Sequence, residues 1–170
     1  MQAPFERAVQ AHGARVLRVV GAVLGPGADA EDAWSETFLS ALRAWPDLPE
    51  DADVAGWLVT IAHRKAVDVV RASARRGTVV AEPPEPGRRT AAVGAPAAGS
   101  TAHVDALDLV AAVAALPPRQ REAVAYHHLA GLPHPQVARL TGRSAAAVRR
   151  SAADGVAALR RAGLDPEEPA

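Results

Sequence analysis

The sequence predicts an all-α protein of two small helical domains. An N-terminal helical bundle is expected over residues 1–76 and a C-terminal helix-turn-helix bundle over residues 105–170, joined by a flexible linker over residues 77–104. In both outer segments apolar residues recur at helical spacing, and no segment alternates as a strand would. The middle segment contains four prolines, four glycines and seven alanines in 28 residues, too little apolar mass for a packed element. A helix-turn-helix spacing also lies near the C-terminus.

The composition limits the core and the chemistry of the protein. Apolar residues make up 49% of its 170 residues, but the aromatic ones are few (three Trp, one Tyr, two Phe). Cysteine is absent, which excludes disulfides and thiolate chemistry and suits a reducing cytosol. The N-terminus lacks a signal-peptide pattern, and no apolar run approaches the roughly eighteen residues of a membrane span. We therefore expect a cytoplasmic protein without direct membrane insertion.

Three helices are expected in the N-terminal bundle. The first runs from about Phe5 to Leu24 and ends at the Gly-Pro-Gly turn that follows. The second begins at Asp29 as N-cap, with an acid three residues later as in a capping box, and stops before Pro46. Its apolar face is formed by Trp34, Phe38, Leu42 and Trp45. The third helix spans about residues 54–76, with Arg64, Asp68, Arg71 and Arg75 along its polar side.

Four helical segments are expected in the C-terminal bundle. Helical spacing resumes at Asp105, and the Pro-Pro pair that ends at Pro118 begins the next helix, which runs to His128 or Leu129. The last two helices span residues 135–141 and 145–162. Gly155 lies in the middle of the final helix, where glycine costs about 1 kcal/mol relative to alanine. We expect it to mark a kink or an early end.

The last two helices have the spacing of a helix-turn-helix unit. Such a unit needs a small residue where its helices touch, a glycine in the turn four residues later, and a buried aliphatic residue six beyond that. Ala138, Gly142 and Val148 satisfy this spacing. Gly142 allows a positive φ in the turn, and Ser144 can cap the second helix. The alternative is an ordinary helical hairpin with a solvated basic face.

In a helix-turn-helix unit the second helix enters the major groove by its N-terminal end. Three small residues, Ala145 to Ala147, permit that approach. Arg149 and Arg150 then reach phosphates or a guanine edge. Arg143 stands where an apolar residue usually packs into the hairpin, so we expect its side chain to turn outward.

Charge is segregated along the chain although the net charge is zero. Residues 28–53 hold eight acids and one arginine, whereas residues 64–76 hold five cations and one acid and residues 139–161 six and one. Eighteen arginines against one lysine leave a coding bias open as the reason for the abundance of arginine. Such a bias does not account for the clustering.

Three sequence blocks follow one another in a characteristic order. They read DAEDAWSETFLSALRAW (29–45), WLVTIAHRKAVDVVRASARR (57–76) and LPPRQREAVAYHHLAGLPHPQVARLTGRSAAAVRR (116–150). Together they resemble an extracytoplasmic-function RNA polymerase sigma factor, the first two its second region and the third its fourth. The resemblance implies an alternative sigma factor that binds core RNA polymerase and directs promoter recognition and transcription initiation. An anti-sigma factor is left open as a further partner.

The resemblance also implies a role for particular residues. Contact with core polymerase falls to Asp32, Glu36 and Arg43. Capture of the non-template strand at the −10 element falls to Arg64, Lys65, Arg71 and Arg75. Recognition of the −35 element falls to Arg143, Ser144, Ala146, Arg149 and Arg150. Two positions depart from the family: Arg64 replaces a frequent asparagine, which favours a phosphate contact, and Ser151 replaces a frequent basic residue.

Other functions fit the sequence less well. A helix-turn-helix transcriptional regulator that binds duplex DNA without polymerase is the main alternative, but it does not need an acidic helix followed by a basic one. No phosphate-binding glycine loop, nucleophile elbow or acid–base constellation is present, so we expect no enzyme, catalytic residue or cofactor. His127, His128 and His134 come nearest to a metal cluster, but adjacent histidines on a helix point in different directions. No metal site is expected.

Overall fold

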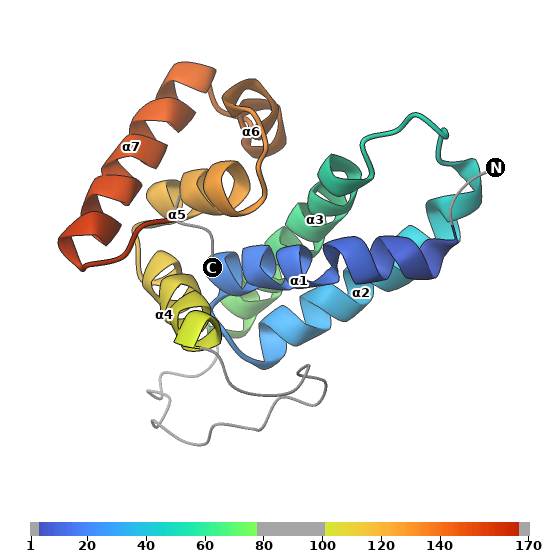
Figure 1. Ribbon diagram of the computed structural model, residues 1–170, viewed down its shortest axis with the longest axis horizontal. Coiled ribbons are helices and arrows are strands. Elements are labelled where there is room, and N and C mark those ends of the chain that lie inside the picture. Colours follow the sequence, from blue (N-terminus) through green and yellow to red (C-terminus); the bar gives the residue numbers. More distant parts are fainter. Residues whose placement is uncertain (1–3, 78–100, 167–170) are drawn as a thin grey trace.

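The computed structural model describes residues 4–77 and 101–166, and of residues 76, 77 and 101–105 only the backbone (Figure 1). Every regular element in these ranges is helical, which confirms the predicted all-α class. The predicted flexible linker lies outside the described residues, except for Gly77 and residues 101–104, which the structure places in helices.

The N-terminal half is a bundle of α1 (Phe5–Leu24), α2 (Ala28–Ala44) and α3 (Val54–Gly77), with a 3₁₀ turn η1 (Trp45–Asp47) after α2. Its apolar stripes meet in a core lined by Val16, Val20, Ala30, Ala33, Phe38, Ala41, Leu58 and Ala62. Aromatic rings close one end, where Phe5 packs edge-on against Trp45 with centroids 5.3 Å apart. The bounds of α1 match the expected ones.

Two expectations for α2 were wrong. Gly27 occupies the N-cap without a side-chain hydrogen bond, and Asp29 lies inside the first turn. Leu42 does not join the buried apolar face, since 51% of it is exposed. The N-cap lies two residues earlier than expected because Gly27, with φ of 144°, accepts from the N–H groups of Ala30 and Glu31 with its carbonyl oxygen.

The C-terminal half contains α4 (Thr101–Ala114), α5 (Pro118–Val124), a π-helical turn η2 (Ala125–Leu129), α6 (His134–Thr141) and α7 (Ala145–Arg161). Pro118 begins α5 as expected. In η2 the Ala130 N–H donates to the Ala125 carbonyl oxygen at 2.9 Å, five residues back.

The expectation that Gly155 ends its helix early was wrong, because α7 continues to Arg161. The glycine has a packing reason instead. A Cβ atom at this position would lie 2.6 Å from Cγ2 of Val124, which is fully buried on α5. Gly155 therefore allows α5 and α7 to approach closely.

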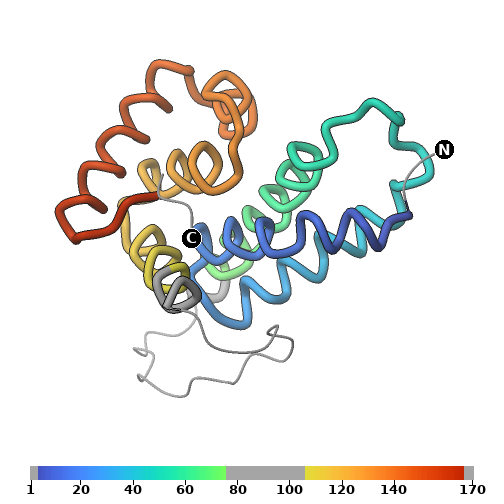
Figure 2. The backbone as a smooth tube through the Cα atoms, viewed as in Figure 1, coloured from blue at the N-terminus to red at the C-terminus, as the bar shows by residue number. Residues whose placement is uncertain are grey.

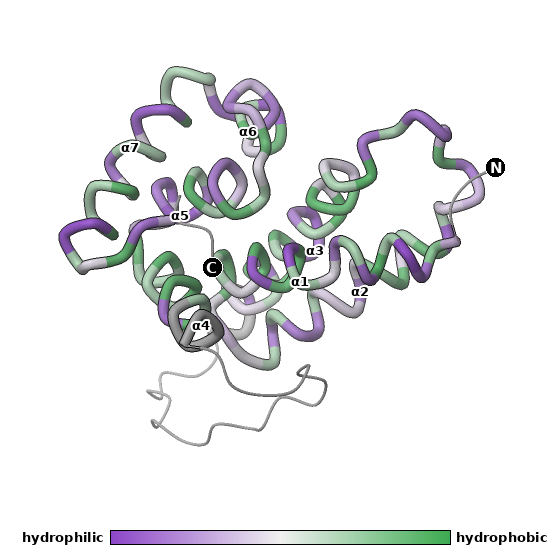
Figure 3. The backbone as a smooth tube through the Cα atoms, in the orientation of Figure 1, coloured by the Kyte–Doolittle hydropathy of each residue, from purple (hydrophilic) through white to green (hydrophobic). Residues whose placement is uncertain are grey.

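The two halves pack against each other (Figure 2), and one hydrophobic core spans both. Val19, Ala22 and Val23 of α1 and Val59 and Ala66 of α3 share it with buried residues of the C-terminal half. Figure 3 shows apolar segments of α1 and α4 facing one another where the halves meet.

Polar contacts also join the halves. The Arg121 Nη1 atom donates to the Val23 carbonyl oxygen at 3.1 Å, which satisfies a backbone acceptor at the end of α1. The Nδ1 atom of His63 lies 2.8 Å from the Tyr126 hydroxyl.

At Gly21 a Cβ atom would meet only Val110 of α4, at 3.1 Å from its Cγ1 atom. The absence of a side chain there lets α1 and α4 lie close together.

Candidate nucleic-acid interface

The helix-turn-helix hairpin forms as the spacing predicts. Gly142 ends α6 in the left-handed conformation with φ of 68°, and Ala138 and Val148 are buried between the two helices. The Ser144 Oγ atom accepts a hydrogen bond from the Ala147 N–H at 3.2 Å and so caps α7. The chain therefore presents the N-terminal end of α7 at the surface in a defined orientation.

The exposed face of α7 carries the residues predicted to meet the −35 element. Ala146, Arg149 and Arg150 are exposed, and Ala145 and Ala147 are half-buried. Small side chains at the leading edge leave room for close approach to a groove. The two arginines follow within one turn, where phosphates and base edges come within their reach.

Arg143 differs from the expectation, since its side chain is half-buried and lies along the start of α7. Its Nη2 atom donates to the Ser151 Oγ atom at 2.7 Å, and its Nη1 atom donates to the Arg119 carbonyl oxygen at 3.3 Å. Ser151, which replaces a frequent basic residue, is the partner that holds the guanidinium group here. This contact ties the turn to the body of α7.

The exposed face of α2 holds more than the predicted charged residues. Asp32, Glu36 and Arg43 are exposed, as a docking role requires. Leu39 and Leu42 on the same helix are 48% and 51% exposed. The sequence already contained this information for Leu39, which stands three residues after Glu36 and four before Arg43 and hence on their side of the helix.

The basic residues of α3 do not form one continuous row. Arg64, Arg71 and Arg75 are exposed, whereas Lys65 is half-buried and its Nζ atom lies 3.5 Å from Oε2 of Glu36 on α2. The structure thus joins one residue expected to contact DNA to one expected to contact polymerase. A partly exposed pair of this kind contributes about 0–1 kcal/mol.

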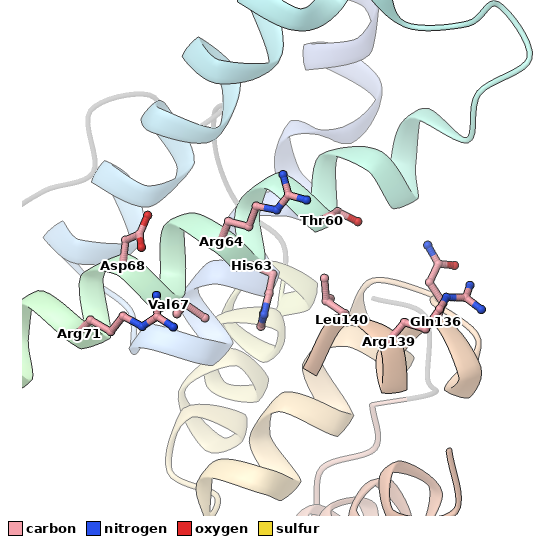
Figure 4. A pocket seen from close by; sticks show the side chains of 9 residues that line it. All are labelled: Thr60, His63, Arg64, Val67, Asp68, Arg71, Gln136, Arg139 and Leu140. Carbon is pink, nitrogen blue, oxygen red and sulfur yellow. The ribbon is translucent and has the colours of Figure 1, made fainter. Parts of the chain in front are cut away.

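A cleft of about 670 Å³ separates α3 from α6 (Figure 4). Its lining residues are Thr60, His63, Arg64, Val67, Asp68, Arg71, Gln136, Arg139 and Leu140. Two residues predicted to capture DNA, Arg64 and Arg71, therefore face the same space as Arg139 from the helix-turn-helix unit. Nothing in the sequence indicates that Arg139 lies near these two residues, because about seventy residues separate it from them.

His63 lies at the edge of this cleft, where the two halves meet. Burial lowers the pKa of His63, the positive charge of Arg64 lowers it further, and a hydrogen bond with the backbone of Leu140 acts in the opposite direction. Burial raises the pKa of the Tyr126 hydroxyl, so this hydroxyl stays protonated and can donate to the neutral imidazole. Their rings meet edge-on with centroids 5.2 Å apart.

The histidines near the hairpin pack against one another. The rings of His127 and His134 stack with centroids 3.8 Å apart, and the His127 Nδ1 atom lies 2.7 Å from the Leu132 carbonyl oxygen. Among the side chains that the structure describes, no three possible ligands (His, Cys, Asp or Glu) gather in a group that could hold a metal ion. The stack fixes the loop between η2 and α6.

Taken with its exposed basic face, the capped hairpin defines a helix-turn-helix DNA-binding protein. The family model described as Sigma-70 region 2 matches residues 8–76, and the one described as Sigma-70, region 4 matches residues 106–159. These two matches fall on the two helical halves. The chain belongs to the sigma-70 family of RNA polymerase sigma factors, which confirms the resemblance, and within it to the alternative sigma factors of the extracytoplasmic-function type.

Relatives support the same assignment. The chain is 27% identical over 159 residues to the RNA polymerase sigma factor NccH of Alcaligenes xylosoxydans xylosoxydans, covering 93% of this chain and 86% of NccH. It is 31% identical over 149 residues to the ECF RNA polymerase sigma factor BldN of Streptomyces coelicolor, covering 85% of this chain and 54% of BldN. It is also 31% identical over 147 residues to an uncharacterised protein of Rhizobium meliloti. That match covers 82% of this chain but only 34% of the relative.

A solved structure shares the fold. The sigma factor RpoE of Bartonella quintana, solved with the anti-sigma factor NepR, superposes with a TM-score of 0.68 at 18% identity, over 92% of this chain and 94% of that one. None of the helices among the described residues is long and apolar enough to cross a membrane.

Proposed function

We propose that this sigma factor binds core RNA polymerase through α2 and brings it to promoters that α3 and α7 recognise. The observation that carries the proposal is the separation of three exposed faces on one scaffold. An acidic face with exposed leucines lies on α2, an arginine face on α3, and a small-residue edge followed by two arginines on α7.

The α2 face suits a protein partner better than DNA. Asp32 and Glu36 supply negative charge, which repels phosphates and attracts a basic protein surface. Leu39 and Leu42 supply apolar area that an interface can bury, and Arg43 lies beside them. Interfaces of this kind combine an apolar centre with a charged rim. Core polymerase is the partner that the family implies for this face.

The α3 and α7 faces suit nucleic acid. Arg64, Arg71 and Arg75 are exposed cations on one helix, as a track for an unpaired strand requires. Lys65 reaches the same strand only after release from Glu36. On α7, Ala146 leads into the major groove and Arg149 and Arg150 follow; the Arg143 side chain positions the turn and Ser144 caps the helix.

The partners and the place of action follow from this role. Polymerase carries out the chemistry of transcription, so the chain itself supplies recognition without catalysis or a cofactor. Because polymerase and promoters lie in the cytoplasm, the chain acts there. RpoE was solved with the anti-sigma factor NepR, and CnrH, which shares the fold with a TM-score of 0.60, was solved with the cytosolic domain of CnrY. We propose that an anti-sigma factor also binds this chain.

Reconstituted transcription tests the proposal. Purified chain and core polymerase are mixed with genomic DNA fragments, and those that the complex retains serve as templates. Initiation at defined sites, seen only when the chain is present, is the expected result. Duplex binding by the chain alone, with no association with core polymerase, would instead show a regulator that acts without polymerase.

A further inference from the structure

We propose that the cleft between α3 and α6 is a binding site for a small, multiply charged phosphate anion, formed only when the two halves are packed together. The site goes beyond promoter binding. Its consequence for promoter capture, given below, rests on the proposed function.

The walls of the cleft supply the groups that a phosphate ligand needs (Figure 4). Arg64 and Arg71 project from α3, and Arg139 projects from α6 beside Gln136. Guanidinium groups bind phosphate oxygens with paired hydrogen bonds, which a single ammonium group cannot match. Val67 and Leu140 add apolar surface. The volume of about 670 Å³ lies within the range of about 300–1,000 Å³ that small-ligand sites occupy.

The charges of the cleft are not neutralised by the protein. Among the described residues, none of Arg64, Arg71 and Arg139 takes part in an ion pair. Asp68 is the one acid in the lining. Three guanidinium groups against one carboxylate leave an excess of positive charge. An anion with two or more negative charges balances this excess, whereas a neutral ligand does not.

The ligand must bind the packed arrangement of the two halves in preference to a separated one. Arg64 and Arg71 belong to the N-terminal half and Arg139 to the C-terminal half, so no separated half carries the full set of cations. The hydrogen bond between His63 and Tyr126 joins α3 to η2 of the C-terminal half beside the cleft. A ligand that binds only the packed form stabilises it by mass action.

This linkage makes the anion an inhibitor of promoter capture. An occupied cleft engages Arg64 and Arg71, the same arginines that we propose for the −10 strand. It also holds α6 against α3. Strand capture and anion binding therefore exclude each other.

Calorimetric titration of the full chain with inorganic tripolyphosphate tests the site. Saturable binding is expected, and Arg139→Gln should weaken it at least about tenfold, as loss of a charge-assisted hydrogen bond does. Arg161→Gln is the matched control, because Arg161 is an exposed arginine at the end of α7 outside the cleft. Equal weakening by both substitutions, or no binding by the parent, overturns the proposal.

A disulfide lock tests the dependence on packing. The chain has no cysteine, and a Cβ atom at Gly21 lies 3.1 Å from Val110 Cγ1, so Gly21→Cys with Val110→Cys places a bond between the halves. The oxidised protein should bind tripolyphosphate at least as tightly as the parent. Loss of binding on oxidation, recovered with reductant, would show that a separated form is the binder and overturn the proposal.

A short single-stranded oligonucleotide distinguishes this site from promoter capture. If it alone binds with the same dependence on Arg139, the cleft is a strand site and the anion proposal is wrong. Transcription by the parent chain with core polymerase does not depend on the outcome, so failure here leaves the proposed function standing.

Discussion

The Nδ1 atom of His63 on α3 lies 2.8 Å from the hydroxyl oxygen of Tyr126 on η2, so a hydrogen bond joins two residues from different family regions. The two rings also meet edge-on, so a ring contact reinforces the hydrogen bond between α3 and the C-terminal half. The protonation state of one imidazole therefore bears on how the halves pack.

The stability of the packed arrangement should fall in mild acid. The pKa of His63 is lowered in the folded protein by burial and by Arg64. The other charged groups of the cleft are Asp68, Arg71 and Arg139. The unfolded chain, with a pKa near 6.5 at this residue, then binds more protons than the folded one. The contribution of His63 to the free energy of unfolding is fully present above about pH 6.5 and decreases as the pH falls below that value.

Thermal unfolding followed between pH 8 and 5 checks this expectation, with His63→Gln as the comparison. Glutamine keeps a polar side chain but does not titrate, so the variant should lose part of the pH dependence. The remaining pH dependence of unfolding persists in the variant, because burial also lowers the pKa of His12 and of His134. Parallel pH profiles for parent and variant would contradict a role for His63.

Charge reversal on α2 should weaken core polymerase binding. Asp32→Lys with Glu36→Lys removes two exposed negative charges and should raise the dissociation constant at least about tenfold. Affinity for a promoter duplex should not fall. Because the halves share a core, the measurement uses the full chain. Unchanged core affinity in the double variant sinks the docking assignment.

Ala146→Glu should abolish binding to a −35 duplex. A carboxylate at the leading edge of α7 both fills the space that the small side chain leaves and repels phosphates. Ala157→Glu is the matched control, since Ala157 is also exposed on α7 but lies about 16 Å further along the helix. Duplex binding by Ala146→Glu at parental affinity would mean that this end of α7 does not enter the groove.

Arg149→Ala should lower the salt dependence of duplex binding. If Arg149 contacts a phosphate, its loss weakens binding to all sequences and reduces the slope of log K against log salt by about 1. A cost of about 1–3 kcal/mol confined to one base pair would instead identify base reading. The same titration assigns Arg150, for which both contacts are open.

Two glycine substitutions should change stability in opposite directions. Gly155→Ala adds a Cβ atom 2.6 Å from Val124 Cγ2, and this overpacking, at about 1–3 kcal/mol, should outweigh the helix-propensity gain of about 1 kcal/mol. At Gly13 of α1 a Cβ atom would lie 3.6 Å from the Trp34 ring, an ordinary contact, so Gly13→Ala should stabilise. Urea unfolding of both variants measures the signs, and a stabilised Gly155→Ala would refute the packing reason.

Local structure could be predicted at positions where a residue type has one dominant structural role, such as glycine at a positive φ or serine at an N-cap. The end of α1 at Leu24, the turn at Gly142 and the cap at Ser144 follow from positive φ and side-chain capping and were found as expected. The family also followed from the order of three blocks. The assignment of each charged residue to polymerase or DNA stays a prediction.

Long-range packing could not be predicted in the same way. Helical periodicity gives a face but not its partner, so the contact of Gly21 with Val110 and the position of Arg139 opposite Arg64 were missed. Leu42 follows the apolar period of α2 yet lies outside the packed area, since the bundle covers only part of that face. Arg143 was expected to meet solvent. Its hydrogen-bond acceptor, Ser151, lies two turns away along α7, and the sequence does not indicate that pairing.

The shared core also has a consequence for the chain while it is being synthesised on the ribosome. Val19, Ala22 and Val23 find their apolar neighbours on α4, α5 and η2, which leave the exit tunnel about a hundred residues later. At translation rates of about 5–20 residues per second, this end of α1 waits for roughly 5–20 s without its cover. During that interval the nascent chain exposes an apolar surface that is prone to aggregate. The yield of folded protein in the cell therefore depends on how well this surface is covered until synthesis is complete.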